Sequence, residues 1–428
     1  MNEPSTSIYD VIIVGASTAG CSAAILYAQQ GLSVALVEKQ SKLDAYKKIC
    51  THYIQSSCMD TLARMGVKDK LEQEADAVPT TIRIWTRWGW IYGANPETDS
   101  GYNIRRMTLD PVLRETAINL SHVKYFPATK FTKLIYKDEK VIGIAARSEK
   151  EKELHLLGQL VVGADGRNSA VALDANIKTH EWENNRFSCF AIYRNLPNEN
   201  RQCSRMWLLD PEVAYQFPND HNTTLIALMP TMEKLPVFKQ DREKCYLDFI
   251  AKLPSAPDLT GAERISDILL NVKNSNLLRG KTPDGLALIG DAVMVSDPLH
   301  GLGIAWAILS AQWLVDSTKH ALLEAEELRA SLAHYRRKRW YETRAHLKII
   351  TDLSVAAPLN PMQRLLFSAA ARDKKVAKIV NDFLAADVGV NKFIGIPNMV
   401  RSLWVNTKYA LNPKLNVATQ LETMDFEK

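Results

Sequence analysis

The stretch YDVIIVGASTAG, residues 9–20, decides the fold of this chain. Its apolar first half predicts a buried strand, Gly15 and Gly20 mark a tight turn, and the residues that follow predict a helix. A second short strand over residues 33–37 then leads to Glu38. A strand, a glycine turn, a helix and a strand that ends in an acidic residue are typical of the first βαβ unit of a dinucleotide-binding domain.

The turn of this unit is expected to hold a pyrophosphate. Backbone N–H groups at a helix start are unpaired, and the helix dipole favours an anion there. Glu38 lies about 20 residues beyond the turn, where a carboxylate accepts a hydrogen bond from a ribose hydroxyl. Ser17 stands in place of the usual middle glycine, which the backbone tolerates if Ser17 keeps a negative φ. The alternative at this point is an apolar strand and helix with no ligand.

The composition describes an ordinary globular protein with more than one unit. The 428 residues exceed the usual size of a single core. The net charge of +5 is mild and suits anionic small molecules, and no basic stripe with interleaved aromatic residues indicates a nucleic acid partner. The six cysteines include no Cys-x-x-Cys pair, which argues against a disulfide framework, a zinc site and a dithiol redox centre.

The hydropathy pattern predicts no signal peptide and no membrane span. The start of the chain, MNEPSTS, lacks the charged and apolar regions of a signal peptide. The longest apolar stretch, residues 298–315, contains His300, Ser310 and Gln312, so we expect a buried helix there. We therefore expect a cytoplasmic protein that is a monomer or a homodimer.

Two later segments predict turns beneath the same ligand. LVVGADGRNS, residues 160–169, is a short buried strand that runs into an Asp-Gly turn. In LIGDAVMVSDPLHGLG, residues 288–303, Asp291 follows a strand, and Gly301 and Gly303 let the backbone approach a flat ring. Each segment alone is compatible with a structural turn, whereas the three in this order indicate one extended cofactor.

Together the three segments resemble the FAD-dependent group A monooxygenases, the family of para-hydroxybenzoate hydroxylase, with the related geranylgeranyl reductases and flavin halogenases. The resemblance implies FAD as the cofactor. It also implies NAD(P)H as a transient reductant, because the chain has no second Gly-x-Gly-x-x-Gly for a separate nicotinamide domain. The residues that it assigns to FAD are Gly15, Ser17, Ala19, Gly20, Glu38, Lys39, Arg106, Asp165, Asp291, Pro298, Gly301, Leu302 and Gly303.

We predict an α/β fold with three parts. A Rossmann-like FAD-binding domain, with a mixed or parallel sheet and helices, is expected in three pieces at residues 1–78, 98–185 and 275–335. An antiparallel β-sheet domain for the substrate interrupts it at residues 79–97 and 186–274. Residues 336–428 are expected to be helical. Asp110-Pro111 is expected to begin a helix of the first domain.

Aromatic residues of the interrupting domain predict a substrate pocket formed by Trp85, Trp90, Tyr215 and Phe217. For the two tryptophans, which fall in an expected hairpin, a purely structural core is the alternative. A dry aromatic wall suits oxygen transfer from a flavin C4a-hydroperoxide, because water destroys that species. We therefore expect an NAD(P)H-consuming monooxygenase that uses molecular oxygen to hydroxylate an aromatic or polyketide-like molecule.

Other functions stay open. Lys48-Ile49-Cys50 and residues 214–218 resemble elements of geranylgeranyl reductases, so reduction of an isoprenoid double bond is the alternative reaction. Flavin halogenases carry a lysine in the strand where this chain has Arg83, which disfavours halogenation. A flavin-bound redox sensor or binding module is the non-enzymatic alternative. The candidate catalytic residues are Cys50, His52 and His300, and for each of them a buried structural side chain is the alternative.

Overall fold

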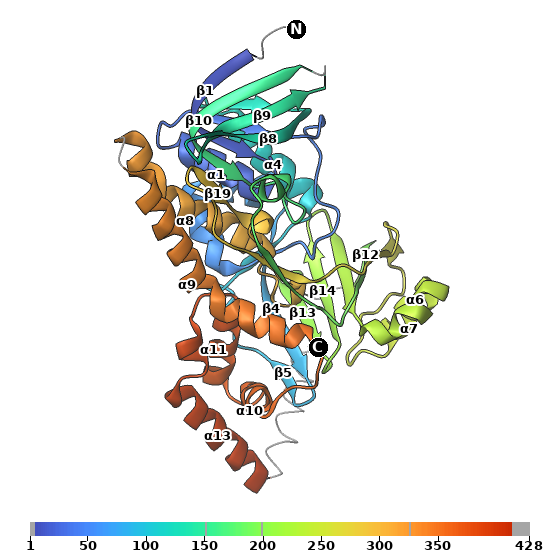
Figure 1. Ribbon diagram of the computed structural model, residues 1–428. Helices are drawn as coiled ribbons and strands as arrows, with labels where there is room; N and C mark the ends of the chain where they lie inside the picture. Colours follow the sequence, from blue (N-terminus) through green and yellow to red (C-terminus); the bar gives the residue numbers. More distant parts are fainter. Residues whose placement is uncertain (1–4, 150–151, 198–199, 325–326, 413–428) are drawn as a thin grey trace.

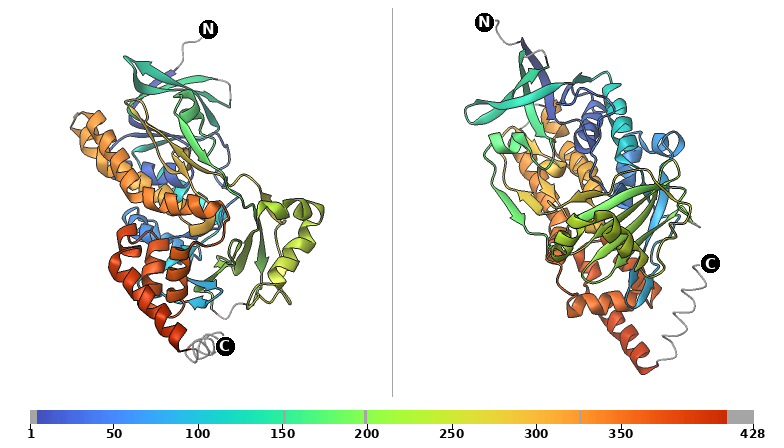
Figure 2. Two further views of the ribbon diagram at one scale, coloured as in Figure 1. Left: turned by 60° about the horizontal axis from the view of Figure 1, so that its bottom comes forward. Right: turned by 90° about the vertical axis from the view of Figure 1, so that its right-hand side faces the viewer.

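The computed structural model describes residues 5–149, 152–197, 200–324 and 327–412 of the chain. Figure 1 shows a sheet with helices at the upper end, a second sheet below it, and a series of helices that runs past both. In the left view of Figure 2 the second sheet lies to the side of the C-terminal helices. The predicted C-terminal region extends to residue 428, and its last part, residues 413–428, lies outside the described residues.

The first sheet has the mixed character that the sequence predicts. Its strands, in spatial order, are β7 (Val123–Phe126), β2 (Val34–Val37), β1 (Ser5–Val14), β10 (Glu153–Gly163), β9 (Lys140–Ser148) and β8 (Thr129–Lys137). The first four are parallel, as is β19 (Leu286–Leu288), which pairs with β10. β9 and β8 are antiparallel additions. This arrangement confirms the predicted Rossmann-like fold class.

Three helices of this part pack together against the sheet. They are α1 (Thr18–Ala28), α4 (Arg106–Ile118) and α8 (Gly303–Leu323). Every residue of α1 is buried, because the helix lies between the sheet and the two other helices. Because α1 is buried on every side, its apolar residues are distributed around the whole helix and do not form a single stripe. The helix starts of α1 and α8 consequently lie at the same edge of the sheet as the ends of β1 and β2.

The second sheet is mostly antiparallel, as predicted. In spatial order it contains β16 (Glu263–Arg264), β12 (Ser188–Arg194), β15 (Thr223–Met229), β14 (Val213–Asn219), β13 (Cys203–Leu208), β4 (Val78–Thr86), β6 (Gly101–Asn103) and β3 (Tyr53–Ile54). β17 (Leu269–Asn271) joins β12, and β5 (Gly89–Ile91) joins β4. The β4–β13 pair is parallel. β3 and β6 come from segments that we assigned to the FAD-binding domain, so the division into domains stays a prediction.

The remaining elements connect and cover the two large sheets. A small third sheet consists of β11 (Thr179–Trp182), β18 (Asn276–Arg279) and β20 (Met294–Val295). The helices α6 (Leu235–Gln240) and α7 (Arg242–Ala251) pack on the face of the second sheet that buries Phe187 and Trp207.

The C-terminal region is helical, as predicted, up to residue 412. Its helices are α9 (Leu328–Ser354), α10 (Pro361–Ala370), α11 (Lys374–Leu384), α12 (Val390–Phe393) and α13 (Ile396–Leu411). α10 and α11 share a core with the other face of the second sheet, and the buried residues of this core include Leu366, Phe383 and Phe217. Among the described residues, no helix is long and apolar enough to cross a bilayer.

Candidate active site

A cavity of about 1080 Å³ lies at the carboxyl ends of the parallel strands, where α/β sheets bind their ligands. The three sequence segments meet there. Of the residues that we assigned to FAD, the cavity is lined by Gly15, Ser17, Ala19, Glu38, Lys39, Arg106, Asp165, Asp291, Pro298, Gly301 and Gly303. Gly20 and Leu302 do not line it, since both are packed beneath its wall. The contact of each residue with FAD stays a prediction.

The glycine turn of the first segment is built for close packing. Gly15 has φ +107°, and a side chain there would place its Cβ 2.5 Å from the carbonyl oxygen of Ala164, in the second segment. A Cβ on Gly20 would lie 1.8 Å from the carbonyl oxygen of Gly15. Ser17 has φ −103°, which confirms that a serine is tolerated at the middle position. The start of α1 therefore opens directly into the cavity.

The carboxylates at the ends of two strands also face the cavity. Glu38 accepts a hydrogen bond from the backbone N–H of Ala16 at 2.8 Å and another from Gln40 at 2.9 Å. These bonds hold its side chain beside the turn. Asp165 accepts hydrogen bonds from the Ser169 hydroxyl and from the backbone N–H of Val171 at 3.1 Å, which shapes the second turn.

The side chains of α4 form a buried ionic row that sequence reasoning missed except for its first member. Arg106 donates to both oxygens of Asp110, at 2.7 and 3.0 Å, and to the Ser17 hydroxyl at 2.8 Å. Arg114 donates to the carbonyl oxygen of Ala16 at 3.1 Å. The four-residue spacing of Arg106, Asp110 and Arg114 could have indicated this row in the sequence, because residues four apart share one face of a helix. This row ties α4 to the glycine turn.

The segment before β3 crosses the cavity and brings a cation and a thiol to it. The ammonium group of Lys47 lies 2.7 Å from a carboxylate oxygen of Asp291, and the backbone N–H of Lys47 donates to Asp110 at 3.0 Å. Cys50 is half-buried and lines the cavity, and its sulfur accepts from the backbone N–H of His52 at 3.3 Å. Sequence reasoning did not select Lys47, although it falls in the polar stretch that precedes Cys50.

The environment of Cys50 favours the thiolate. Burial raises the thiol pKa, but the hydrogen bond from His52 and the charges of His52, Arg106 and Lys47 outweigh it and lower the pKa to about 6. The other cysteines with a shifted pKa are Cys21, Cys58, Cys189 and Cys203, and burial raises the pKa of each. Among these shifted thiols, Cys50 is therefore the one whose proton is exchanged readily near neutral pH.

The groups around the cavity fit an FAD. Helix starts at α1 and α8 attract the negative charge of a pyrophosphate or a ring carbonyl, and Glu38 and Asp291 suit hydroxyl groups. A Cβ added at Gly303 would meet nothing within 4 Å, so the backbone there faces open space in the way that a flat ring requires. Gly301 has φ +63°, which turns the chain sharply just before α8.

At one end the cavity is lined by a row of apolar side chains from the second sheet, which we call the apolar floor. The row continues across the sheet beyond the cavity. The side chains of this floor are paired neighbours on five adjacent strands, in the order Phe190, Ala227, Tyr215, Met206 and Ile84. Phe190, Ala227 and Tyr215 line the large cavity. Tyr215, Met206 and Ile84 line a narrow second cavity of about 40 Å³, which α11 closes from above.

The four aromatic residues that we predicted for the substrate divide into two pairs. Tyr215 and Phe217 lie on the cavity face, with ring centroids 5.2 Å apart, and Tyr215 is part of the floor. Trp85 and Trp90 line neither cavity. They face each other across β4 and β5 and pack in the opposite core with Trp207. Trp85 follows Ile84, and successive residues of a strand point to opposite faces, so the two tryptophans lie in the structural core that was their alternative. A contact of either tryptophan with a substrate stays a prediction.

The two histidines have structural surroundings. His52 is buried, and its Nδ1 accepts a hydrogen bond from the backbone N–H of Arg106 at 3.0 Å, which positions the start of α4. His300 lines the narrow cavity. Burial, together with the charges of His346 and Arg186, lowers the pKa of His300 to about 3. The imidazole of His300 is therefore neutral near pH 7, and its predicted part in proton transfer is untested.

We expect His300→Gln to reduce the loss of stability in acid. The unfolded chain protonates this imidazole near pH 6.5, whereas the folded chain resists protonation down to about pH 3. Stability is therefore lost as the pH falls between these values, by up to about 1.4 kcal/mol per pH unit for this group. Urea unfolding from pH 7 to 4.5 should show a shallower decline for the variant, and parallel declines would contradict the assignment.

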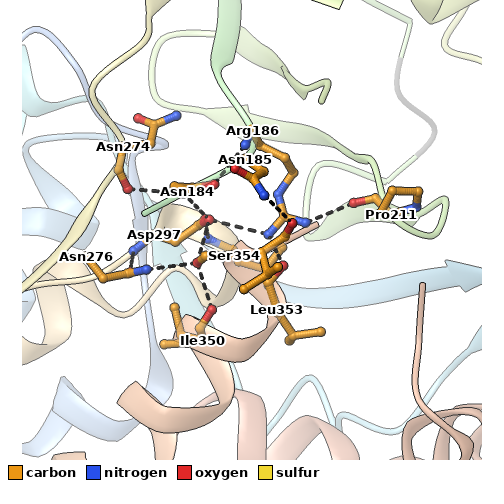
Figure 3. A network of polar contacts seen from close by, with 12 residues as sticks. Asn184, Asn185, Arg186, Pro211, Asn274, Asn276, Asp297, Ile350, Leu353 and Ser354 are labelled. Atoms are coloured by element: carbon orange, nitrogen blue, oxygen red, sulfur yellow. Dashed lines mark hydrogen bonds and ion pairs between the residues drawn. The ribbon is translucent and has the colours of Figure 1, made fainter. Parts of the chain in front are cut away.

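Figure 3 shows a buried polar junction around Asp297, the residue before Pro298. Asp297 is 1% exposed and accepts a hydrogen bond from the backbone N–H of Leu299 at 2.8 Å. Three further side chains bind its second oxygen at 2.6, 3.4 and 3.2 Å, namely Asn184, Arg186 and Ser354. These partners come from the strand connection before β12 and from the end of α9. The junction therefore fixes the cavity loop relative to the second sheet and the C-terminal helices.

Comparisons with known proteins agree with this geometry. The FAD binding domain family matches residues 8–345. A digeranylgeranylglycerophospholipid reductase of Methanosarcina mazei is 25% identical over 346 residues, which cover 79% of this chain and 82% of that protein. The squalene epoxidase of Aspergillus fumigatus is 27% identical over 318 residues, which cover 70% of this chain and 64% of that protein.

Two solved structures show the same fold. The flavin-dependent brominase Bmp2 aligns with a TM-score of 0.75 at 14% identity, covering 95% of this chain and 100% of the brominase. A geranylgeranyl bacteriochlorophyll reductase-like protein of Thermoplasma acidophilum aligns with a TM-score of 0.65 at 19% identity, covering 97% of this chain and 99% of that protein.

Proposed function

This chain belongs to the FAD binding domain family and is an FAD-dependent oxidoreductase, and from this premise we propose that it reduces carbon–carbon double bonds in an elongated, isoprenoid-like substrate. The observation that carries the proposal is the apolar floor. Five adjacent strands spaced at about 4.8 Å make a strip roughly 19 Å long, of which the part from Phe190 to Tyr215 lines the large cavity and the rest lies under α11. Such a strip suits an extended hydrocarbon better than a compact aromatic ring. Both relatives named above carry isoprenoid compounds in their names.

The thiol of Cys50 supports reduction over oxygen transfer. Addition of hydrogen across a double bond needs a hydride at one carbon and a proton at the other. The protonated form of a thiol whose pKa is about 6 gives up its proton readily, and it is the main form only below that pH. Electrophilic oxygen reagents oxidise thiolates. A reactive thiol on the cavity wall is therefore compatible with reduction and a liability in oxygenation.

The residues of the site divide the work of this reaction. Bound FAD, once reduced, supplies the hydride chemistry. Gly15, Ser17 and Glu38 would hold its nucleotide half, and Asp291 and Gly303 would hold the half that carries the ring. The floor side chains would orient the hydrocarbon and exclude water. Lys47 and Arg106 keep the Cys50 thiol polarised through their positive charge.

Hydroxylation or epoxidation by an NAD(P)H-consuming monooxygenase is the second candidate. Its support is the same dry apolar floor, which suits an oxygen-transferring flavin. The substrate that we expected from the sequence was a compact aromatic or polyketide-like molecule, and the length of the floor favours a longer one. Molecular oxygen and NAD(P)H are cosubstrates of this second candidate reaction, and we propose them only together with it.

We expect the reduced protein to saturate geranylgeraniol in the absence of oxygen. The flavin would be reduced anaerobically, its absorbance followed after addition of the lipid, and the product analysed by mass spectrometry for added hydrogens. Reoxidation of the flavin together with added hydrogen atoms supports the reductase. Incorporation of labelled oxygen in air, with no anaerobic product, would establish the monooxygenase instead. A protein that takes up no FAD would contradict both candidates.

A further inference from the structure

The last described helix, α13, carries an exposed apolar stripe that the reaction does not use. At 100° per residue, its bulky apolar side chains fall within about one quarter to one third of the helix circumference. Their exposed fractions range from 55% to 81%, and the residues are Ile396, Val400, Leu403, Trp404 and Leu411. The helix projects from the lower end of the molecule in Figure 1.

The opposite side of α13 is a normal packing surface. Ser402 and Val405 are buried at 0% and 2% exposure, and Asn406 bonds to Ser368 and Leu365 of α10. Arg401 forms an ion pair with Asp373 at the start of α11 at 2.6 Å. The helix is therefore firmly attached, and the apolar stripe is not the result of a detached helix end.

The charged residues of α12 and α13 are all basic, and one of them, Arg401, is paired with Asp373. Residues 388–412 contain Lys392, Arg401 and Lys408 and no acidic residue. The ammonium group of Lys408 lies 5.5 Å from the ring centre of Trp404, at the border of the stripe. Lys374 and Lys375, both exposed, follow the Asp373 that binds Arg401. An apolar face that contains tryptophan and has basic residues along its edge is typical of helices that lie in the headgroup region of a membrane.

We propose that α13 docks this protein on an anionic lipid surface, with its apolar stripe inserted among the acyl chains and its lysines at the headgroups. A second copy of the chain is a poorer occupant. A two-fold symmetric contact through the stripe would bring the basic edges of the two copies together and leave them without acidic partners. A lipid surface with negative headgroups satisfies the apolar stripe and the basic edge at once. The inference does not depend on the proposed reaction.

The position of α13 relates membrane docking to the path by which a substrate would reach the apolar floor. α13 packs against α10 and α11, and α11 closes the narrow cavity at the end of the apolar floor. A membrane beneath α13 would therefore lie close to the helix that covers the substrate path.

The test is co-sedimentation of the FAD-loaded full chain with vesicles of equimolar phosphatidylcholine and phosphatidylglycerol. We expect the wild-type chain to bind, and Leu403→Glu/Trp404→Glu to bind about 100-fold more weakly, because two bulky side chains no longer enter the acyl region. Leu173→Glu is the matched control, since Leu173 is 82% exposed on another surface, and it should bind like the wild type. Vesicles of phosphatidylcholine alone should bind the wild type less, and added salt should weaken binding to the anionic vesicles.

Three results would overturn the proposal. The first is a wild-type chain that stays in the supernatant with anionic vesicles. The second is a double variant that binds as well as the wild type, which would place the contact elsewhere. The third is a wild-type chain that sediments as a dimer without lipid while the double variant is a monomer, which would give the stripe to a second copy. Flavin content and the reduction of geranylgeraniol are measured in separate assays, so a failure of the proposed reaction can be distinguished from a failure of membrane docking.

Discussion

Asp110→Ala should cost the protein about 3–5 kcal/mol of stability, the usual effect of breaking a buried ion pair by removing one partner. Asp110 is 0% exposed, and it accepts hydrogen bonds from Arg106 and from the backbone of Lys47. Its removal takes from the guanidinium of Arg106, which is 4% exposed, the carboxylate that accepts two of its hydrogen bonds. Domains are typically stable by about 5–15 kcal/mol in total, so the loss would be a large share. Urea unfolding followed by circular dichroism measures it.

The matched control for this variant is Asp316→Ala. Asp316 pairs with Arg64 at 2.8 Å on the protein surface, where both side chains are roughly one third exposed. An exposed pair of this kind is worth about 0–1 kcal/mol. We also expect Asp110→Ala to retain less FAD after gel filtration, because Arg106 positions Ser17 in the cofactor turn. Equal urea midpoints for the two variants would show that the row on α4 is not structural.

The backbone of the cofactor site was predictable because its signals are local. A glycine turn between an apolar strand and a helix specifies its own geometry, and Gly15 meets the second segment at a distance that only a glycine permits. The third segment likewise combines a strand end, Asp291 and the start of α8 within sixteen residues, 288–303. In each case the residues that define the turn are neighbours in the chain.

The polar support of that site was not predictable in the same way. Asp110-Pro111 has the form of a helix start, but α4 begins four residues earlier at Arg106. Proline inside the helix removes the hydrogen bond to the carbonyl of Met107, which lies on an exposed part of the helix where water can replace it. Arg106 pairs with Asp110 one turn further along α4 and donates to Ser17, and the bond to Ser17 is a tertiary contact that the local pattern does not contain.

The face of the second sheet that lines the cavities was not predictable for a different reason. Trp85 and Ile84 are neighbours in β4, and a sequence does not say which of the two faces of a sheet will meet the cofactor. The pairing of five strands decides it, and that pairing joins segments more than 100 residues apart, such as Ile84 and Met206. The floor residues Phe190, Ala227 and Met206 could not be selected before this register was known.

Cys50→Ser should lower kcat for double-bond reduction by about 10²–10⁴-fold, the usual contribution of a positioned acid, while the flavin stays bound. A serine hydroxyl keeps the size of the side chain but holds its proton far more tightly than a thiol whose pKa is about 6. The direction in which kcat/KM changes with pH tests whether Cys50 acts as the proton donor. The thiol donates only when protonated, so kcat/KM of the wild type should fall as the pH rises through about 6. This limb of the profile should be absent from the variant.

Cys245→Ser is the control for Cys50→Ser, because Cys245 is also partly buried but lies on α7, away from both cavities. It should leave kcat and its pH profile unchanged. A merely structural role for Cys50 would change flavin affinity or stability and leave the pH limb of the residual activity in place. A variant that keeps both full turnover and the limb would remove Cys50 from the reaction, and the apolar floor would then support the oxygen-transferring candidate equally well.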